Sequence, residues 1–287
     1  MLKSWKGGIT MFRYEFMVIA FVVALLLGLT FPLLGGTVVY KKLSSSGDAL
    51  AHSALAGVAI GLVSGLQALY MSIVCCVISF LLIGLLRRKF GKHAEIGVVV
   101  VLSAAIAVTG ILSGYASSGN FESYLFGSIL LISYDELYVV IALAAISIFF
   151  FFFTYHRQMA CLYSEEEAKI ARVPVRLLDF LHSLLFALTV AIGAKIVGSL
   201  VVSSMLVLPT AAALLLKKGY RMTCIISVIV SLISMSSGIV LSYYLDWKPG
   251  ATSVGVAVVI LLFFLLYRGV SRALLRHKRL NAPVSDQ

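Results

Sequence analysis

Two ionisable residues, Asp48 and His52, stand four positions apart in an otherwise apolar stretch, GDALAHSALAGVAIG (residues 47–61). In a helix, residues four positions apart lie on one face, a turn from each other. A carboxylate oxygen and an imidazole nitrogen are suitable ligands for zinc, manganese or iron in the divalent state. One Asp and one His do not complete a coordination shell. The stretch therefore indicates either transient metal ligands or an Asp48 that caps the helix and pairs with His52 without any ion.

Three other ionisable residues in or beside apolar runs are candidates for a transport pathway. Glu95 begins one such run just after a basic loop, where it could cap a helix, pair with Lys92 or line a transport pathway. Asp179 and His182 are three positions apart and share a helix face. They form either a buried polar contact or part of a pathway lining, and the sequence leaves both readings open.

The elements that must position these residues are membrane-spanning helices. Of the 287 residues, 61% are hydrophobic and 12% are charged, and the mean hydropathy is +1.06. These values are typical of an integral membrane protein rather than a soluble domain. Apolar runs of about 20 residues, each long enough to cross a bilayer, predict an all-α polytopic bundle of eight or nine spans. The runs are 14–38, 49–66, 68–86, 94–114, 135–155, 177–194, 197–216, 222–245 and 250–267.

A stripe of small residues marks the span that carries the candidate ligands. Ala49, Ser53, Gly57 and Gly61 recur at four-residue spacing, and such stripes let helix backbones approach closely inside a membrane. We therefore expect this helix to lie deep in the bundle and to carry its two ionisable residues into the interior. Ionisable side chains in spans usually face a partner or a cavity and mark a pathway.

The formal net charge of +11 is concentrated in clusters. Cytoplasmic loops concentrate Lys and Arg, so the clusters predict one cytoplasmic face, an external N-terminus and an internal C-terminus. We expect a single permease domain over 1–287, with a membrane core at 14–268 and a basic cytoplasmic tail at 269–287. Anionic lipid headgroups and a cytoplasmic partner explain this charge, and nucleic acid does not. The clusters lie at 41–42, 87–92, 157–176, 217–221 and 268–279.

Two segments depart from the simple pattern of spans and short loops. Residues 115–134 are too short in their apolar part to cross the membrane and contain Gly119 and Gly127, which favours a re-entrant half-helix. Residues 156–176 form the longest polar insert. Within it, Ser164 precedes three consecutive acids, and Pro174 follows ten residues later. A serine cap and acids in the first turn predict a short cytoplasmic helix there.

Motifs of the commonest enzyme classes are absent from the sequence. It contains no G-x-x-x-x-G-K-[ST] phosphate loop, so the chain is not expected to hydrolyse ATP itself. The patterns HExxH and GxSxG are absent as well. We therefore expect a transport subunit rather than an enzyme.

Several blocks together resemble the membrane permease subunits of ATP-binding-cassette (ABC) importers for zinc, manganese or iron. GDALAHSALAGVAIG is similar to that family's signature around its Asp and His. Four further segments resemble segments of that family and occur in the same order. They are HAEIGVVVVLSAAIA (93–107), ESYLFGSILLIS (122–133), the long block at 171–216 and LSYYLDWKPGATSVG (241–255). Together the blocks extend over most of residues 30–265, which is far more specific than any single motif.

The resemblance implies a bacterial cytoplasmic-membrane permease that works as a homodimer with a cytoplasmic ABC ATPase dimer and an extracytoplasmic metal-binding protein. Asp48 and His52 fall on the family's Asp and His, which line the metal route. Zinc, manganese or iron would be cargo, with no cofactor bound by this chain. Arg172 stands where the family often has glycine. The resemblance also implies that the insert docks the ATPase through Glu165, Glu166, Glu167, Ala168, Arg172 and Pro174.

Two other transport classes stay open at this stage. A proton-coupled secondary transporter would be expected to show two matching halves with broken helices, and no such repeat is visible in the sequence. An ABC permease for a metal chelate, such as a siderophore or cobalamin, would need no Asp and His ligand pair. Binding of the naked ion would distinguish the metal permease from the chelate permease.

Overall fold

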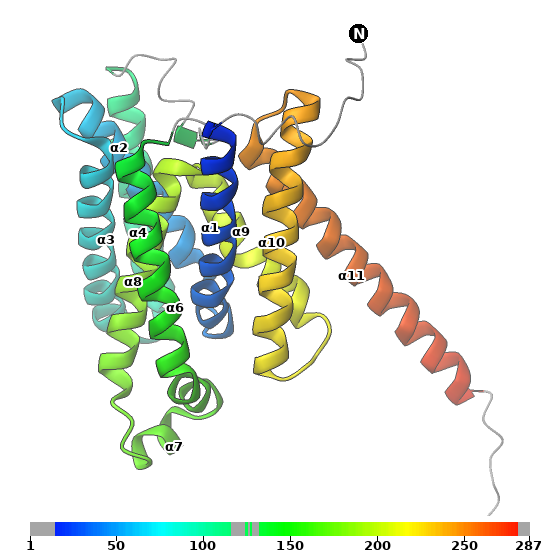
Figure 1. The fold of residues 1–287 in the computed structure, drawn as a ribbon. Coiled ribbons are helices and arrows are strands. Elements are labelled where there is room, and N and C mark those ends of the chain that lie inside the picture. The colour runs from blue at the N-terminus through cyan, green and yellow to red at the C-terminus, as the bar shows by residue number, and fades with distance from the viewer. Residues whose placement is uncertain (1–14, 116–123, 126, 128–131, 281–287) are drawn as a thin grey trace, which may run out of the picture.

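The structure, a computed structural model, describes residues 15–115, 124–125, 127 and 132–280, and every regular element in these ranges is a helix (Figure 1). The predicted all-α fold is thus confirmed. Eight of the described helices are long and apolar enough to cross a membrane. They are α1 (Glu15–Tyr40), α2 (Ser44–Ser64), α3 (Ala68–Phe90), α4 (Ala94–Ser113), α6 (Tyr134–Tyr163), α8 (Val175–Ile196), α10 (Tyr220–Leu245) and α11 (Pro249–Leu280).

Three shorter helices complete the described part. The 3₁₀ turn η2 (Gly91–His93) joins α3 to α4, and α7 (Glu165–Ile170) lies between α6 and α8. The apolar helix α9 (Ser199–Leu214) has 16 residues, fewer than the roughly 20 that a straight crossing needs. It packs against α1, α2, α8, α10 and α11. The predicted span 197–216 is therefore a short helix that packs against five other helices.

The helix ends fall into two groups, as the charge clusters predict. Lys41, Arg87, Tyr163 and Asp179 line one cavity of about 440 Å³, so the ends of α1, α3 and α6 meet the start of α8. We call this the inner end of the bundle. At the opposite, outer end, Glu136 at the start of α6 forms an ion pair with Lys195 in the last turn of α8. The one lysine of α8 is thus paired.

The core lies where α1, α2, α8 and α9 meet. Phe31, Leu34, Val190 and Met205 are buried there in one continuous apolar cluster. In contrast, α3, α4 and α11 expose most of their apolar side chains, as expected for helices that face lipid or a partner. Figure 1 shows α11 diverging from the other helices toward its C-terminal end.

Several helices are longer than the apolar runs that predicted them. Helix α2 begins at Ser44, so that Asp48 lies inside it rather than at its mouth. Helix α6 continues to Tyr163 because its polar residue Gln158 faces the interior and is buried. Helix α11 continues to Leu280, into the segment expected to be a tail. Most of the predicted re-entrant segment, 115–134, lies outside the described residues, and that prediction stays open.

Candidate metal-transport site

Helix α2 carries Asp48 and His52 on one face and packs against α3 through small residues on another face. A Cβ atom added to Gly57 would lie 2.4 Å from the carbonyl oxygen of Met71 in α3, and one added to Gly61 would lie 2.9 Å from the Cα of Ala68. Only glycine allows the two backbones to approach this closely. The small-residue stripe therefore seats α2 against α3, and the ionisable face points elsewhere.

The two candidate ligands lie on a strip of α2 that the rest of the chain leaves uncovered. Asp48 is exposed and His52 is half-buried, whereas Leu55 and Ala56, the next residues along that face, are buried. We call residues 45, 48 and 52 the open strip. It is widest at the inner end and closes near the middle of the helix. The expectation that the bundle would enclose both side chains is wrong, because α3, α4, α8 and α9 cover only the other faces of α2.

Asp48 and His52 keep their ligand atoms available. In the described part of the chain, neither side chain forms a hydrogen bond with the other or with a third residue, although they are one turn apart. Among the same residues, no group of three or more His, Cys, Asp or Glu side chains could hold a metal ion. The pair therefore offers one oxygen and one nitrogen ligand, and further ligands must come from water or another chain.

Glu95 lies at the inner end and is exposed in the first turn of α4. It lines a cavity of about 370 Å³ together with Ser45 of the open strip. Basic side chains of Lys41, Lys42 and Arg87 line the same cavity. Glu95 thus stands near the open strip in a predominantly basic surrounding, which favours a role in local charge balance over a role as a bare metal ligand.

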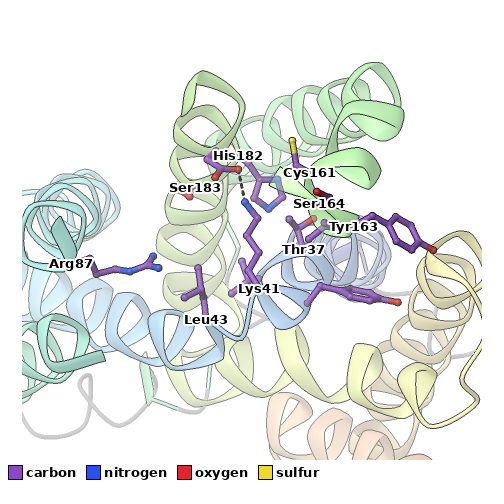
Figure 2. A pocket seen from close by; sticks show the side chains of 13 residues that line it. Thr37, Lys41, Leu43, Arg87, Cys161, Tyr163, Ser164, His182 and Ser183 are labelled. Atoms are coloured by element: carbon purple, nitrogen blue, oxygen red, sulfur yellow. Dashed lines mark hydrogen bonds and ion pairs between the residues drawn. The ribbon is translucent and has the colours of Figure 1, made fainter. Parts of the chain in front are cut away.

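Asp179 and His182 both line the cavity of about 440 Å³ at the inner end, but they make different contacts. Asp179 Oδ1 accepts a hydrogen bond from Lys41 Nζ at 2.5 Å, which ties the start of α8 to the residue that follows α1. Figure 2 shows Lys41 extending across the cavity toward α8, close to His182. Asp179 therefore has a cationic partner of its own and does not pair with His182.

The His182 side chain is buried and joins three helices. Its Nε2 lies 3.1 Å from the carbonyl oxygen of Leu34 in α1, and its Nδ1 lies 3.4 Å from Gln158 Nε2 in α6. Gln158 also donates to Thr154 Oγ1 and accepts from Thr37 Oγ1. Both ring nitrogens thus have hydrogen-bond partners, as buried polar groups require. The buried contacts of His182 are thus with Leu34 and Gln158 rather than with Asp179, and His182 also lines the cavity of about 440 Å³. Its place in a pathway stays a prediction.

The predicted short helix in the polar insert is present as α7. Its amide at Glu167 donates to Ser164 Oγ at 3.2 Å, which is the expected serine cap. Glu166 and Glu167 are exposed, while Ala168 is buried against α6 and α8. Figure 1 shows α7 projecting at the inner end of the bundle. Acidic side chains are thus presented beyond the membrane-spanning helices.

The turn after α7 explains why glycine suits position 172. Arg172 has φ of +57°, in the left-handed region, where glycine is favoured because other residues carry a Cβ atom that is strained there. The Arg172 amide donates to the carbonyl of Lys169, and Pro174 then caps α8. Arg172 therefore adopts this turn conformation at a small cost in conformational energy.

The sequence does not reveal the partners of these residues. Lys41 lies in a basic cluster and Gln158 in the polar insert, and neither position indicates a contact with a distant helix. A signal existed for Lys195, because a lone lysine at the end of an apolar run indicates a partner. No comparable signal pairs Lys41 with Asp179, since 138 positions separate them.

Comparison with known proteins agrees with this arrangement. The sequence matches the ABC 3 transport family over residues 13–268. The chain belongs to the ABC 3 transport family. It is 35% identical over 265 residues to a probable metal transport system membrane protein of Treponema pallidum, covering 92% of this chain and 99% of that one.

Other known proteins are similar over comparable lengths. The high-affinity zinc uptake system membrane protein ZnuB of Buchnera aphidicola is 25% identical over 244 residues, covering 84% of this chain and 93% of ZnuB. The structure of PsaBC from Streptococcus pneumoniae in complex with Fab superposes with a TM-score of 0.78 at 22% identity. That match covers 89% of this chain and 93% of the other and shows a shared fold. The protein is a multi-pass membrane protein of a transport family.

Proposed function

We propose that this chain is the permease through which a divalent transition-metal ion, zinc, manganese or iron, crosses the cytoplasmic membrane inward. Membership in an ABC transport family supports ATP-driven transport, with hydrolysis on separate ATPase subunits. Relatives named for metal transport and zinc uptake support the cargo class. The observation that carries the proposal is the open strip, where Asp48 and His52 present unpaired ligand atoms on a membrane-spanning helix.

The placement of Asp48 argues for a role beyond structure. An ionised carboxylate facing lipid costs about 2.5–3.5 kcal/mol at the centre of a span and less toward its end. Asp48 lies in the second turn of α2 and has no salt-bridge partner in the described part of the chain to offset such a cost. A passing cation would offset it. Two ligands bind an ion weakly enough to release it, which a transport route requires.

A second copy of the chain would complete the site. The open strip is a polar surface on a helix most of whose residues are buried, so it needs a cover that is not lipid. In a two-fold dimer the same patch of both copies meets across the axis. Two open strips facing each other would offer two carboxylates and two imidazoles to one passage between the copies.

The other partners follow from the two ends of the bundle. Exposed acids on α7 suit a cytoplasmic ATPase dimer that docks there through the segment from Glu165 to Pro174. An extracytoplasmic binding protein would deliver the metal at the outer end. The basic inner-end side chains suit anionic lipid headgroups, and Glu95 and Asp179 lie beside the route as it leaves the membrane.

The experiment is metal accumulation in cells that depend on this importer, with Asp48→Ala or His52→Ala at normal expression. Each variant is expected to lower accumulation strongly, because half of the ligand pair is lost. Asp135→Ala is the matched control, since Asp135 is an exposed acid at the outer start of α6. Wild-type accumulation in both ligand variants would refute the ligand assignment.

A further inference from the structure

The turn between α1 and α2 is closed by its own backbone. Only residues 41–43 separate the two helices, and the amides of Lys41, Lys42 and Leu43 all donate to carbonyls in the last turn of α1. Lys42 has φ of +57°, a left-handed conformation that makes the chain reverse sharply. A force on Lys41 is therefore passed to the first turn of α2 with little slack, and that turn carries the open strip.

The partner of Lys41 stands at the opposite side of the inner cavity. Asp179 lies in the second turn of α8, five positions after Pro174, which ends the connection from α7. Helix α7 packs on α6 and on α8, with Ala168 buried beside Val175. A displacement of α7 therefore moves the start of α8 and Asp179 with it.

The ion pair crosses space that is otherwise open. The cavity of about 440 Å³ separates the α1–α2 turn from the α6–α7 junction, and both Lys41 and Asp179 line it. Their 2.5 Å contact is a charge-assisted hydrogen bond, with the Lys41 side chain 21% exposed and the Asp179 side chain 40% exposed. It links the α1–α2 turn to α8 at a level where a cavity, rather than packed side chains, lies between them (Figure 2).

We propose that the Lys41–Asp179 ion pair is the positioning contact that transmits movement of α7 to α2 and so couples the ATPase to the metal ligands. The inference rests on the proposed function, because it assumes that the ATPase docks at α7. Neither residue touches the metal. The ion pair determines the position of the open strip when α7 moves.

The test follows α2 directly, in liposomes that contain the full transport complex with its ATPase. A spin label on Ser45→Cys reports on the exposed first turn of α2. Nucleotide is expected to change its spectrum in the wild-type background. Lys41→Glu and Asp179→Lys are each expected to reduce this change about fivefold or more, while the ATPase still co-purifies. The charge swap that combines both substitutions is expected to restore it.

Matched variants separate coupling from folding. Lys42→Glu makes the same charge change at the neighbouring, exposed position and is expected to keep the nucleotide response, and Lys41→Arg preserves the ion pair. A response that persists in both charge reversals, or that the swap fails to restore, would overturn the proposal. Metal flux measured in the same liposomes tests the proposed function separately, because absent flux with an intact label response would refute transport and leave the coupling contact standing.

Discussion

Buried and uncovered polar side chains have different roles in this protein. Thr37, Gln158 and His182 have their hydrogen bonds satisfied inside the bundle, whereas Asp48 and His52 lie on the open strip without such partners. Satisfied polar groups stabilise a bundle, because leaving them unpaired in hydrocarbon is costly. Unpaired groups on a span remain available to a ligand.

His182→Ala is expected to reduce stability rather than transport. The substitution removes the hydrogen bonds to Leu34 and Gln158 and should lower the free energy of unfolding by about 1–3 kcal/mol. Thermal unfolding in detergent measures this effect, and His156→Ala is the control because His156 is exposed. Metal uptake per folded molecule should stay close to wild type. An equally stable His182→Ala protein that has lost uptake would instead place His182 in the pathway.

The sequence predicts the candidate ligand pair but not the residues that surround it. Spacing alone places Asp48 and His52 on one helix face, because helix periodicity is local. Whether that face is buried depends on which neighbours cover it, and those neighbours come from distant parts of the chain. The prediction of an enclosed pair failed for this reason, and the Lys41–Asp179 contact could not be foreseen.

Helix packing against α2 depends on glycine. The backbone of α3 lies 2.4 Å from where a Gly57 Cβ atom would stand, so α2 and α3 cannot keep their distance if that atom is added. Helix identity and order followed from apolar runs, since length and hydropathy suffice for spans. The helix ends could not be predicted from the apolar runs. A polar residue such as Gln158 can extend a helix when neighbouring helices satisfy its hydrogen bonds.

Gly57→Ala is expected to destabilise the bundle by about 1–3 kcal/mol through overpacking. Gly84→Ala is the matched control on α3, where an added Cβ atom has no neighbour within 4 Å. That change should be neutral or stabilising by up to about 1 kcal/mol, since alanine has the higher helix propensity. Thermal unfolding of the two purified variants checks the comparison, and equal shifts in both would contradict the close approach of α2 and α3.

At the scale of the whole molecule, the two ends of the bundle differ in the side chains that they gather. The inner end gathers basic side chains, the cavity and α7, and the outer end is fastened by the pairs Glu136–Lys195 and Tyr134–Glu15. The open strip reaches from the inner end to the middle of α2 and closes beyond His52. In the described conformation, the proposed ligand residues Asp48 and His52 are therefore uncovered toward the inner end.

The most direct measurement is the initial rate of ATP-dependent metal uptake into liposomes that contain the full complex, with Asp48→Asn compared against Asp135→Asn. Losing a charged ligand contact worth at least about 1.4 kcal/mol predicts a fall of about tenfold or more for Asp48→Asn. Asp135→Asn should retain the wild-type rate, and a proton gradient without ATP should drive no uptake. Equal rates in Asp48→Asn and wild type would contradict the claim that the metal passes along the open strip.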